Sequence, residues 1–122
     1  IATDHAPHDS ESKRVPMEVA SFGIVGLETM LSLSLGLYHQ GIMSLRDVLA
    51  AMTYKAADII HIPAGRLKKG APADLVVFDP DAQWVIKNEH LHSKSKNSPF
   101  DGTPTKGKAL RTVMAGETVY LA

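Results

Sequence analysis

Hydrophobic residues recur at helical spacing in the first half of the chain. From about Ile24 to His39 the apolar positions lie three or four residues apart, which predicts one buried helix. Gly41 is a typical residue for ending such a helix. The segments LRDVLAAM and YKAADIIH predict two further short helices, and Ser44 with Asp47 resembles a capping box at the start of the first.

The pattern in the second half of the chain is that of strands. The segment DLVVFDP is apolar and rich in β-branched residues, and QWVIK follows it after a predicted turn at Pro80–Asp81. The segments RTVMA and TVYLA flank Gly116–Glu117, which predicts a tight hairpin turn. Strands and turns are therefore expected after the helices.

The N-terminal residues follow a third pattern. The apolar run IAT predicts the end of a buried strand that stops at Asp4, and the polar residues 5–21 predict a long irregular loop. Loops of this length are often functional. A strand, a long loop and helices suit the rim of an α/β barrel. We therefore expect residues 1–62 to be the last strand, loop and helices of a barrel, and residues 63–122 part of a β-sandwich.

Composition and charge exclude several classes of function. The 122 residues carry thirteen basic and thirteen acidic side chains, so no net charge directs the chain to nucleic acid or to an anionic membrane. The absence of cysteine excludes a disulfide framework, a thiolate zinc site and a cysteine nucleophile, and it fits a cytoplasmic location. The most apolar segment contains Glu28 and is shorter than the ~20 residues that span a bilayer.

The candidate chemistry lies at Asp4 and His8. A carboxylate at the carboxyl end of a barrel strand lies on the face where such barrels build their active sites. Aspartate and neutral imidazole both bind zinc, and an aspartate beside a metal-bound hydroxide can accept its proton and pass it on. A strand-ending aspartate can also simply cap a turn, and the spacing alone leaves both interpretations open. His5 adjoins Asp4 and is expected to have a packing role.

Four motifs in register resemble the C-terminal part of the dihydroorotases, which belong to the amidohydrolase superfamily. These motifs are IATDHAPH, FGIVGLET, GRLKKGAPADLVVFDP and SKSKNSPFDG, and together they extend over nearly the whole chain. The resemblance implies an α/β fold, with the end of a (β/α)8 metal-dependent hydrolase barrel followed by part of a β-sandwich.

The resemblance also implies roles for individual residues. Asp4 would bind a metal and act as general acid and base, and His8 would hold the substrate carboxylate. Phe22 and Gly23 would contact the substrate ring through their backbone. The implied cofactor is zinc, with two ions in each active site. The other ligands of the family are absent from these 122 residues, so we expect this chain to need a preceding barrel segment and to be inactive alone.

The implied reaction is the reversible hydrolysis of the cyclic amide of L-dihydroorotate to N-carbamoyl-L-aspartate, a step of pyrimidine biosynthesis. A homo-oligomer is expected, since the apolar helix would otherwise be exposed. Two alternatives stay open. The first is another cyclic amidohydrolase of the hydantoinase or allantoinase type. The second is an inactive dihydroorotase-like module that serves structure or interaction.

Overall fold

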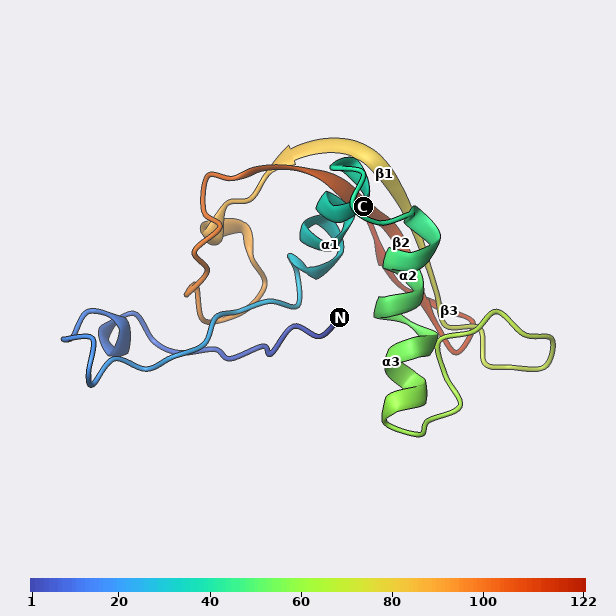
Figure 1. The fold of residues 1–122 in the computed structure, drawn as a ribbon, viewed down its shortest axis with the longest axis horizontal. Helices are drawn as coiled ribbons and strands as arrows, with labels where there is room; N and C mark the ends of the chain where they lie inside the picture. The colour runs from blue at the N-terminus through green and yellow to red at the C-terminus, as the bar shows by residue number, and fades with distance from the viewer.

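Three short helices form the first half of the fold. The computed structural model describes all residues from 1 to 122. Helix α1 comprises Met30–His39, α2 comprises Leu45–Met52 and α3 comprises Tyr54–Ile59. In Figure 1, α2 and α3 descend together on one side of the molecule, and the loop before α1 projects on the other. The predicted helical region is therefore confirmed as three helices.

Helix α1 begins six residues later than the spacing predicted. Residues 24–26 are held in extended structure by contacts with distant parts of the chain. Ile24 forms an isolated β-bridge with His5, and the Val25 amide donates to the Asn97 carbonyl at 3.4 Å. Because these backbone groups are bonded elsewhere, they are not available for the first turn of a helix.

The start of α2 agrees with the capping prediction. The Ser44 hydroxyl accepts a hydrogen bond from the Asp47 amide at 3.1 Å, and Ser44 has extended backbone angles. The Ser44 hydroxyl also lies 2.6 Å from Asp47 Oδ2. This local pairing satisfies one of the free amides at the helix start.

The second half of the chain forms an antiparallel sheet in the order β1-β2-β3. Strand β1 comprises Leu75–Val85, β2 Pro104–Met114 and β3 Glu117–Leu121. The turn predicted at Pro80–Asp81 is wrong. One strand continues through this point with an irregular register, and Asp79 Oδ1 accepts hydrogen bonds from the next free amides, at 2.8 Å from Asp81 and 3.2 Å from Ala82. A side chain thus replaces the missing ladder partners.

The predicted hairpin is present between β2 and β3, but its turn lies one residue earlier. Ala115 and Gly116 both have positive φ, at 50° and 88°, as a two-residue type I′ turn requires. Glu117 is already in β3. The Ala115 amide is bonded to Asp74 Oδ1 at 2.8 Å, which connects the turn to the residue before β1.

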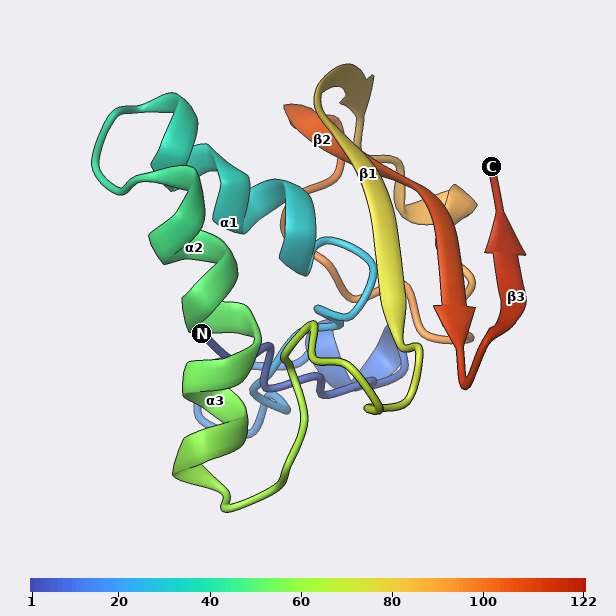
Figure 2. The same ribbon diagram turned by 90° about the vertical axis from the view of Figure 1, so that its right-hand side faces the viewer.

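Helix α1 packs against β2, and its residues Ser32, Ser34 and Leu35 are buried. Figure 2 shows α1 beside the sheet, with α2 and α3 farther from it. Leu35 of α1 is fully buried against Gly107 of β2, where a Cβ atom would overlap its side chain. The Trp84 indole of β1 donates to the Gly107 carbonyl at 2.9 Å. Part of the helix face expected to be exposed is therefore covered by the sheet.

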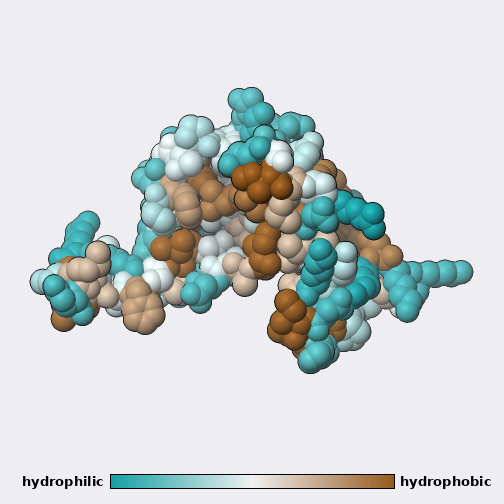
Figure 3. Space-filling view, in the orientation of Figure 1, coloured by the Kyte–Doolittle hydropathy of each residue, from teal (hydrophilic) through white to brown (hydrophobic).

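Much apolar surface nevertheless remains exposed. Only 13 of the 122 residues are buried, and large hydrophobic side chains such as Ile59 and Leu67 are more than three-quarters exposed. Figure 3 shows hydrophobic surface around the hollow between the projecting loop and the helical side. Residues 1–3, predicted to end a buried strand, form no strand within this chain, and Ile1 is 44% exposed. None of the helices has the length and apolar character needed to cross a membrane.

Candidate active site

Asp4 has an uncommon backbone conformation. Its φ of 45° lies in the left-handed region, which aspartate occupies more readily than most residues. Asp4 is exposed, and none of the ion pairs of the chain includes it. Uncommon backbone angles concentrate at functional sites, so this geometry supports a role beyond that of a turn residue.

His5 holds the start of the chain against the residues that precede α1. The Gly26 amide donates to His5 Nδ1 at 3.1 Å, and the Ala6 amide donates to the Ile24 carbonyl at 2.8 Å. A Cβ atom on Gly26 would lie 3.0 Å from the Thr3 carbonyl oxygen. Two segments therefore lie side by side: the N-terminal segment, residues 3–8, and the return segment, residues 22–26.

Between these segments the chain forms the long loop that the sequence predicted. It contains one short 3-10 helix, Glu11–Lys13, and projects from the body of the molecule. The Lys13 ammonium group donates to the Ser21 carbonyl, and to the Gly23 carbonyl at 2.7 Å. This lysine closes the base of the loop, a role that the sequence pattern did not indicate.

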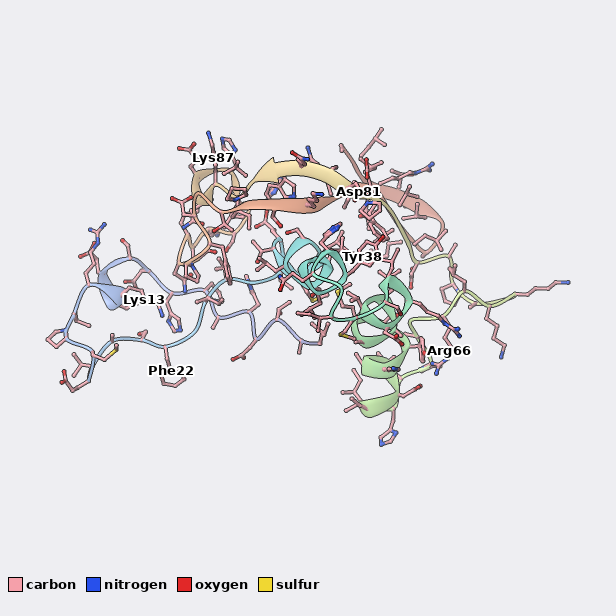
Figure 4. All side chains as sticks on the ribbon, turned by 45° about the horizontal axis from the view of Figure 1, so that its top comes forward. Lys13, Phe22, Tyr38, Arg66, Asp81 and Lys87 are labelled. Carbon is pink, nitrogen blue, oxygen red and sulfur yellow. The ribbon has the colours of Figure 1, made fainter.

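The structure places His8 and Gly23 close together but leaves Phe22 outside. Gly23 has a φ of 101°, and a Cβ atom there would lie 2.5 Å from Ala6 Cβ and 3.8 Å from His8 Nε2. Only glycine fits this position, because both the angle and the space exclude a side chain. Phe22 is 93% exposed and points away from the loop in Figure 4.

The motif SKSKNSPFDG lies against the same two segments. Asn97 bonds to Ala6, His8 and Gly23 through its side chain, and the Ser95 hydroxyl reaches the His8 carbonyl. The motif is visible in the sequence, but no pattern in it indicates a role for Asn97. No local pattern identifies such a residue, since its partners are more than seventy residues away in the sequence.

Glu28 connects the return segment to the chain after β1. Its carboxylate accepts hydrogen bonds from the His92 amide at 2.8 Å and the Ser93 amide at 3.0 Å, and it lies 2.9 Å from His92 Nδ1. Partial burial raises the pKa of Glu28, but these hydrogen bonds outweigh it and the pKa falls below its ordinary value. Glu28 also lines a groove of about 870 Å³ between α1 and the sheet, which neither Asp4 nor His8 lines.

The chain by itself does not supply a complete metal site. No three histidine, cysteine or acidic residues are grouped so that they could hold an ion. Zinc sites use three or four protein ligands, and here Asp4 is a single exposed carboxylate. Asp4 can contribute one ligand to a metal site, but this chain does not form a complete metal site.

The chain is similar in sequence to curated proteins of known name. The chain is 62% identical to the dihydroorotase of Wolbachia sp. subsp. Drosophila simulans (strain wRi) over 120 residues, or 98% of this chain and 27% of the relative. It is 57% identical to the dihydroorotase of Ehrlichia chaffeensis over 122 residues, all of this chain and 27% of that protein. The chain thus spans about a quarter of the length of the curated relatives that it matches.

Solved structures of cyclic amidohydrolases have the same fold over this region. A D-hydantoinase from Bacillus sp. AR9 superimposes with a TM-score of 0.88 at 24% identity, and covers 98% of this chain and 28% of its own. The L-hydantoinase from Arthrobacter aurescens gives a TM-score of 0.80 at 33% identity, over 85% of this chain and 24% of its own. A sequence model of the amidohydrolase family matches residues 1–119, and the chain belongs to this family.

Proposed function

We propose that this chain is the C-terminal part of a dihydroorotase, which opens the cyclic amide of L-dihydroorotate to N-carbamoyl-L-aspartate and reverses that reaction in pyrimidine biosynthesis. The observation that carries this proposal is the identity of 56–62% to five proteins named dihydroorotase, over nearly the whole chain. The hydantoinase structures share the fold at lower identity. Residues 1–62 would then belong to the barrel and residues 63–122 to a β-sandwich.

Asp4 is the residue that we assign to the chemistry. Its carboxylate is exposed and belongs to none of the ion pairs of the chain, so it is free to meet groups from the rest of the protein. In the proposed reaction Asp4 binds a metal, accepts a proton from the attacking water and gives it to the departing amide nitrogen. When bound, zinc would polarise the amide carbonyl and make water more acidic.

His8, Phe22 and Gly23 are assigned to the substrate. A histidine can hold a carboxylate through a charge-assisted hydrogen bond, and His8 lies beside Gly23. The Gly23 carbonyl is already bonded to Lys13 and Asn97, so its amide is the backbone group that we assign to the substrate ring. The exposed position of Phe22 supports only a backbone role, as the family resemblance implies.

The remaining metal ligands must come from the rest of the protein. The exposed hydrophobic residues of this chain provide a surface on which a preceding barrel segment can pack. We propose that this segment, and not solvent, covers them in the full-length protein. A homo-oligomer is proposed on the same ground, because any apolar surface that the barrel leaves free favours association.

A hydantoinase-type activity is the second candidate, favoured by the 33% identity to the L-hydantoinase. The test is to assay the purified full-length protein with L-dihydroorotate and with a hydantoin. We expect turnover of dihydroorotate. Turnover of the hydantoin alone would transfer the assignment to the second candidate, and inactivity with no bound metal would favour a structural module.

The role of Asp4 is tested by Asp4→Asn in the same protein. This variant keeps the size of the side chain but cannot serve as a base, so kcat is expected to fall by about a hundred-fold to ten-thousand-fold. Asp9→Asn is a matched control, because Asp9 is an exposed acid five residues later in the sequence that bonds only to Ser12. Near-normal turnover by Asp4→Asn would contradict the assignment.

A further inference from the structure

Asn97 connects the two segments that carry the proposed site residues. Its Nδ2 group donates to the Ala6 carbonyl at 2.9 Å and to the Gly23 carbonyl at 3.3 Å. Its Oδ1 atom accepts from the His8 amide at 3.3 Å. One side chain therefore bonds to the N-terminal segment at two residues and to the return segment at a third.

The partners of Asn97 fix the orientation of its amide. Carbonyl oxygens can only accept hydrogen bonds, so the two carbonyls require the NH₂ group. The His8 amide can only donate, so it requires the oxygen. An aspartate has the same shape, but it would present an oxygen to both carbonyls and lose both bonds. The position thus specifies an amide, and not merely a polar side chain.

Neighbouring atoms reinforce the same connection. The Asn97 carbonyl accepts from the Val25 amide at 3.4 Å. The Ser95 hydroxyl lies against the His8 carbonyl and 2.7 Å from Asn97 Oδ1, and its single proton can serve either acceptor. Residues 95–97 therefore hold His8 through both its amide and its carbonyl, and they hold the return segment through Gly23 and Val25.

We propose that Asn97 is a positioning residue for substrate binding, which sets the distance between His8 and the Gly23 backbone. The inference rests on the proposed function for its substrate. Asp4 is attached differently, through the contacts of Thr3 and His5 with Gly26. Loss of Asn97 should therefore disturb the substrate-holding residues more than the metal-binding one.

The test uses Asn97→Ala and Asn97→Asp in the full-length protein. We expect the KM for L-dihydroorotate to rise by about ten-fold or more, because a small displacement of a positioning group has large effects. The fold-change in kcat should be smaller, and the zinc content should match that of the wild type. Agreement between the two variants excludes charge repulsion by the new carboxylate as the cause. Asn88→Ala is the control, since the Asn88 side chain bonds to Ser98 and not to either segment.

Amide hydrogen exchange at His8 provides a readout that does not depend on the reaction. Asn97→Ala removes the acceptor of this amide, so its exchange should accelerate by about ten-fold or more, whereas Asn88→Ala should leave it unchanged. Unaltered KM and unaltered His8 exchange in Asn97→Ala would overturn the proposal. Equal losses of kcat and zinc would also overturn it, because they would show a general structural role.

Two further results distinguish a failure of the Asn97 positioning role from a failure of the proposed function. If the Asn97 variants do not fold, Ser95→Ala decides, and it should raise KM by about two-fold to five-fold with normal zinc content. An unchanged KM in that variant would reject the positioning role. If the wild-type protein does not turn over dihydroorotate, the proposed function fails, and His8 exchange alone decides whether Asn97 holds the segment.

Discussion

The Glu28 carboxylate illustrates how a single residue joins distant parts of this chain. It accepts hydrogen bonds from two successive backbone amides, those of His92 and Ser93, and a third contact comes from the His92 ring. The bonds favour the charged form of the carboxylate, which explains the direction of its pKa shift despite partial burial. The stabilisation that Glu28 gives to the fold should therefore depend on pH.

Glu28→Gln is predicted to destabilise the full-length protein in a pH-dependent manner. Because the pKa of Glu28 is lowered from its ordinary value of 4.5, the stabilisation is complete above that value. It is lost as the pH falls through the lowered pKa of the folded state. Urea unfolding should show a difference between wild type and variant at about pH 7 that shrinks towards about pH 3.

The matched control for this prediction is Glu18→Gln. Glu18 is exposed and belongs to none of the ion pairs of the chain. Its substitution should leave the free energy of unfolding nearly unchanged across the same pH range. A Glu28→Gln difference that stays constant with pH would show that the charge of Glu28 is not what stabilises the contact.

At the scale of elements, some helix and strand boundaries are set by neighbouring residues and others by residues far away in the sequence. The cap of α2 and the hairpin between β2 and β3 depend on residues that are adjacent in sequence, and both were predicted. The start of α1 depends on Asn97 and His5, which are far away, and it was predicted six residues too early. Arg66 of the GRLKKG motif shows the same dependence on tertiary contacts: it pairs with Asp58 of α3 at 2.7 Å and lies over the Tyr54 ring.

Ser44→Ala is predicted to lower the free energy of unfolding by about 1 kcal/mol, since it leaves an amide at the start of α2 without its side-chain acceptor. Ser44→Asp keeps an acceptor at this position and should restore most of the stability. Denaturant unfolding of the three proteins measures the effect. Equal stability of Ser44→Ala and wild type would mean that water replaces the cap without cost.

At the scale of the whole molecule, exposed apolar surface is the dominant property. Large hydrophobic side chains are exposed on α3, on β1 and β3, and in the projecting loop, including Ile59, Val77 and Met17. Exposed apolar surface of this kind favours contact with further protein. It fits a chain that packs on further barrel structure, as proposed above.

The isolated 122-residue chain is therefore predicted to self-associate and to lack dihydroorotase activity. Sedimentation should show species larger than the 13.2 kDa monomer, and metal analysis should find no stoichiometric zinc. The full-length protein, examined in parallel, should bind metal and turn over substrate. A stable monomer of the isolated chain at high concentration would contradict the first expectation, and zinc-dependent turnover by that chain would contradict the second.

The sequence by itself determined the features that depend on short-range spacing. Helical periodicity, the Ser44 cap, the strand pattern and the motifs around Asp4 are visible because their residues lie within a few positions of one another. The family resemblance rested on the same motifs, and the match over residues 1–119 confirms it. The roles of Asp4, His8, Phe22 and Gly23 stay predictions.

Only the tertiary structure decided how the opening motif meets the later parts of the chain. The opening motif IATDHAPH lies against the return segment through direct hydrogen bonds of His5 and Ala6, and Ser95 and Asn97 reinforce the contact across 74 to 91 residues of sequence. Such bonds leave no periodic signal in the sequence. A polar residue with a distant hydrogen-bond partner cannot be distinguished there from a polar residue that faces solvent. The replacement of the Pro80–Asp81 turn by a continuous strand has a related cause: β1 pairs with β2 on both sides of this point, and Asp79 bonds the amides of Asp81 and Ala82 between them.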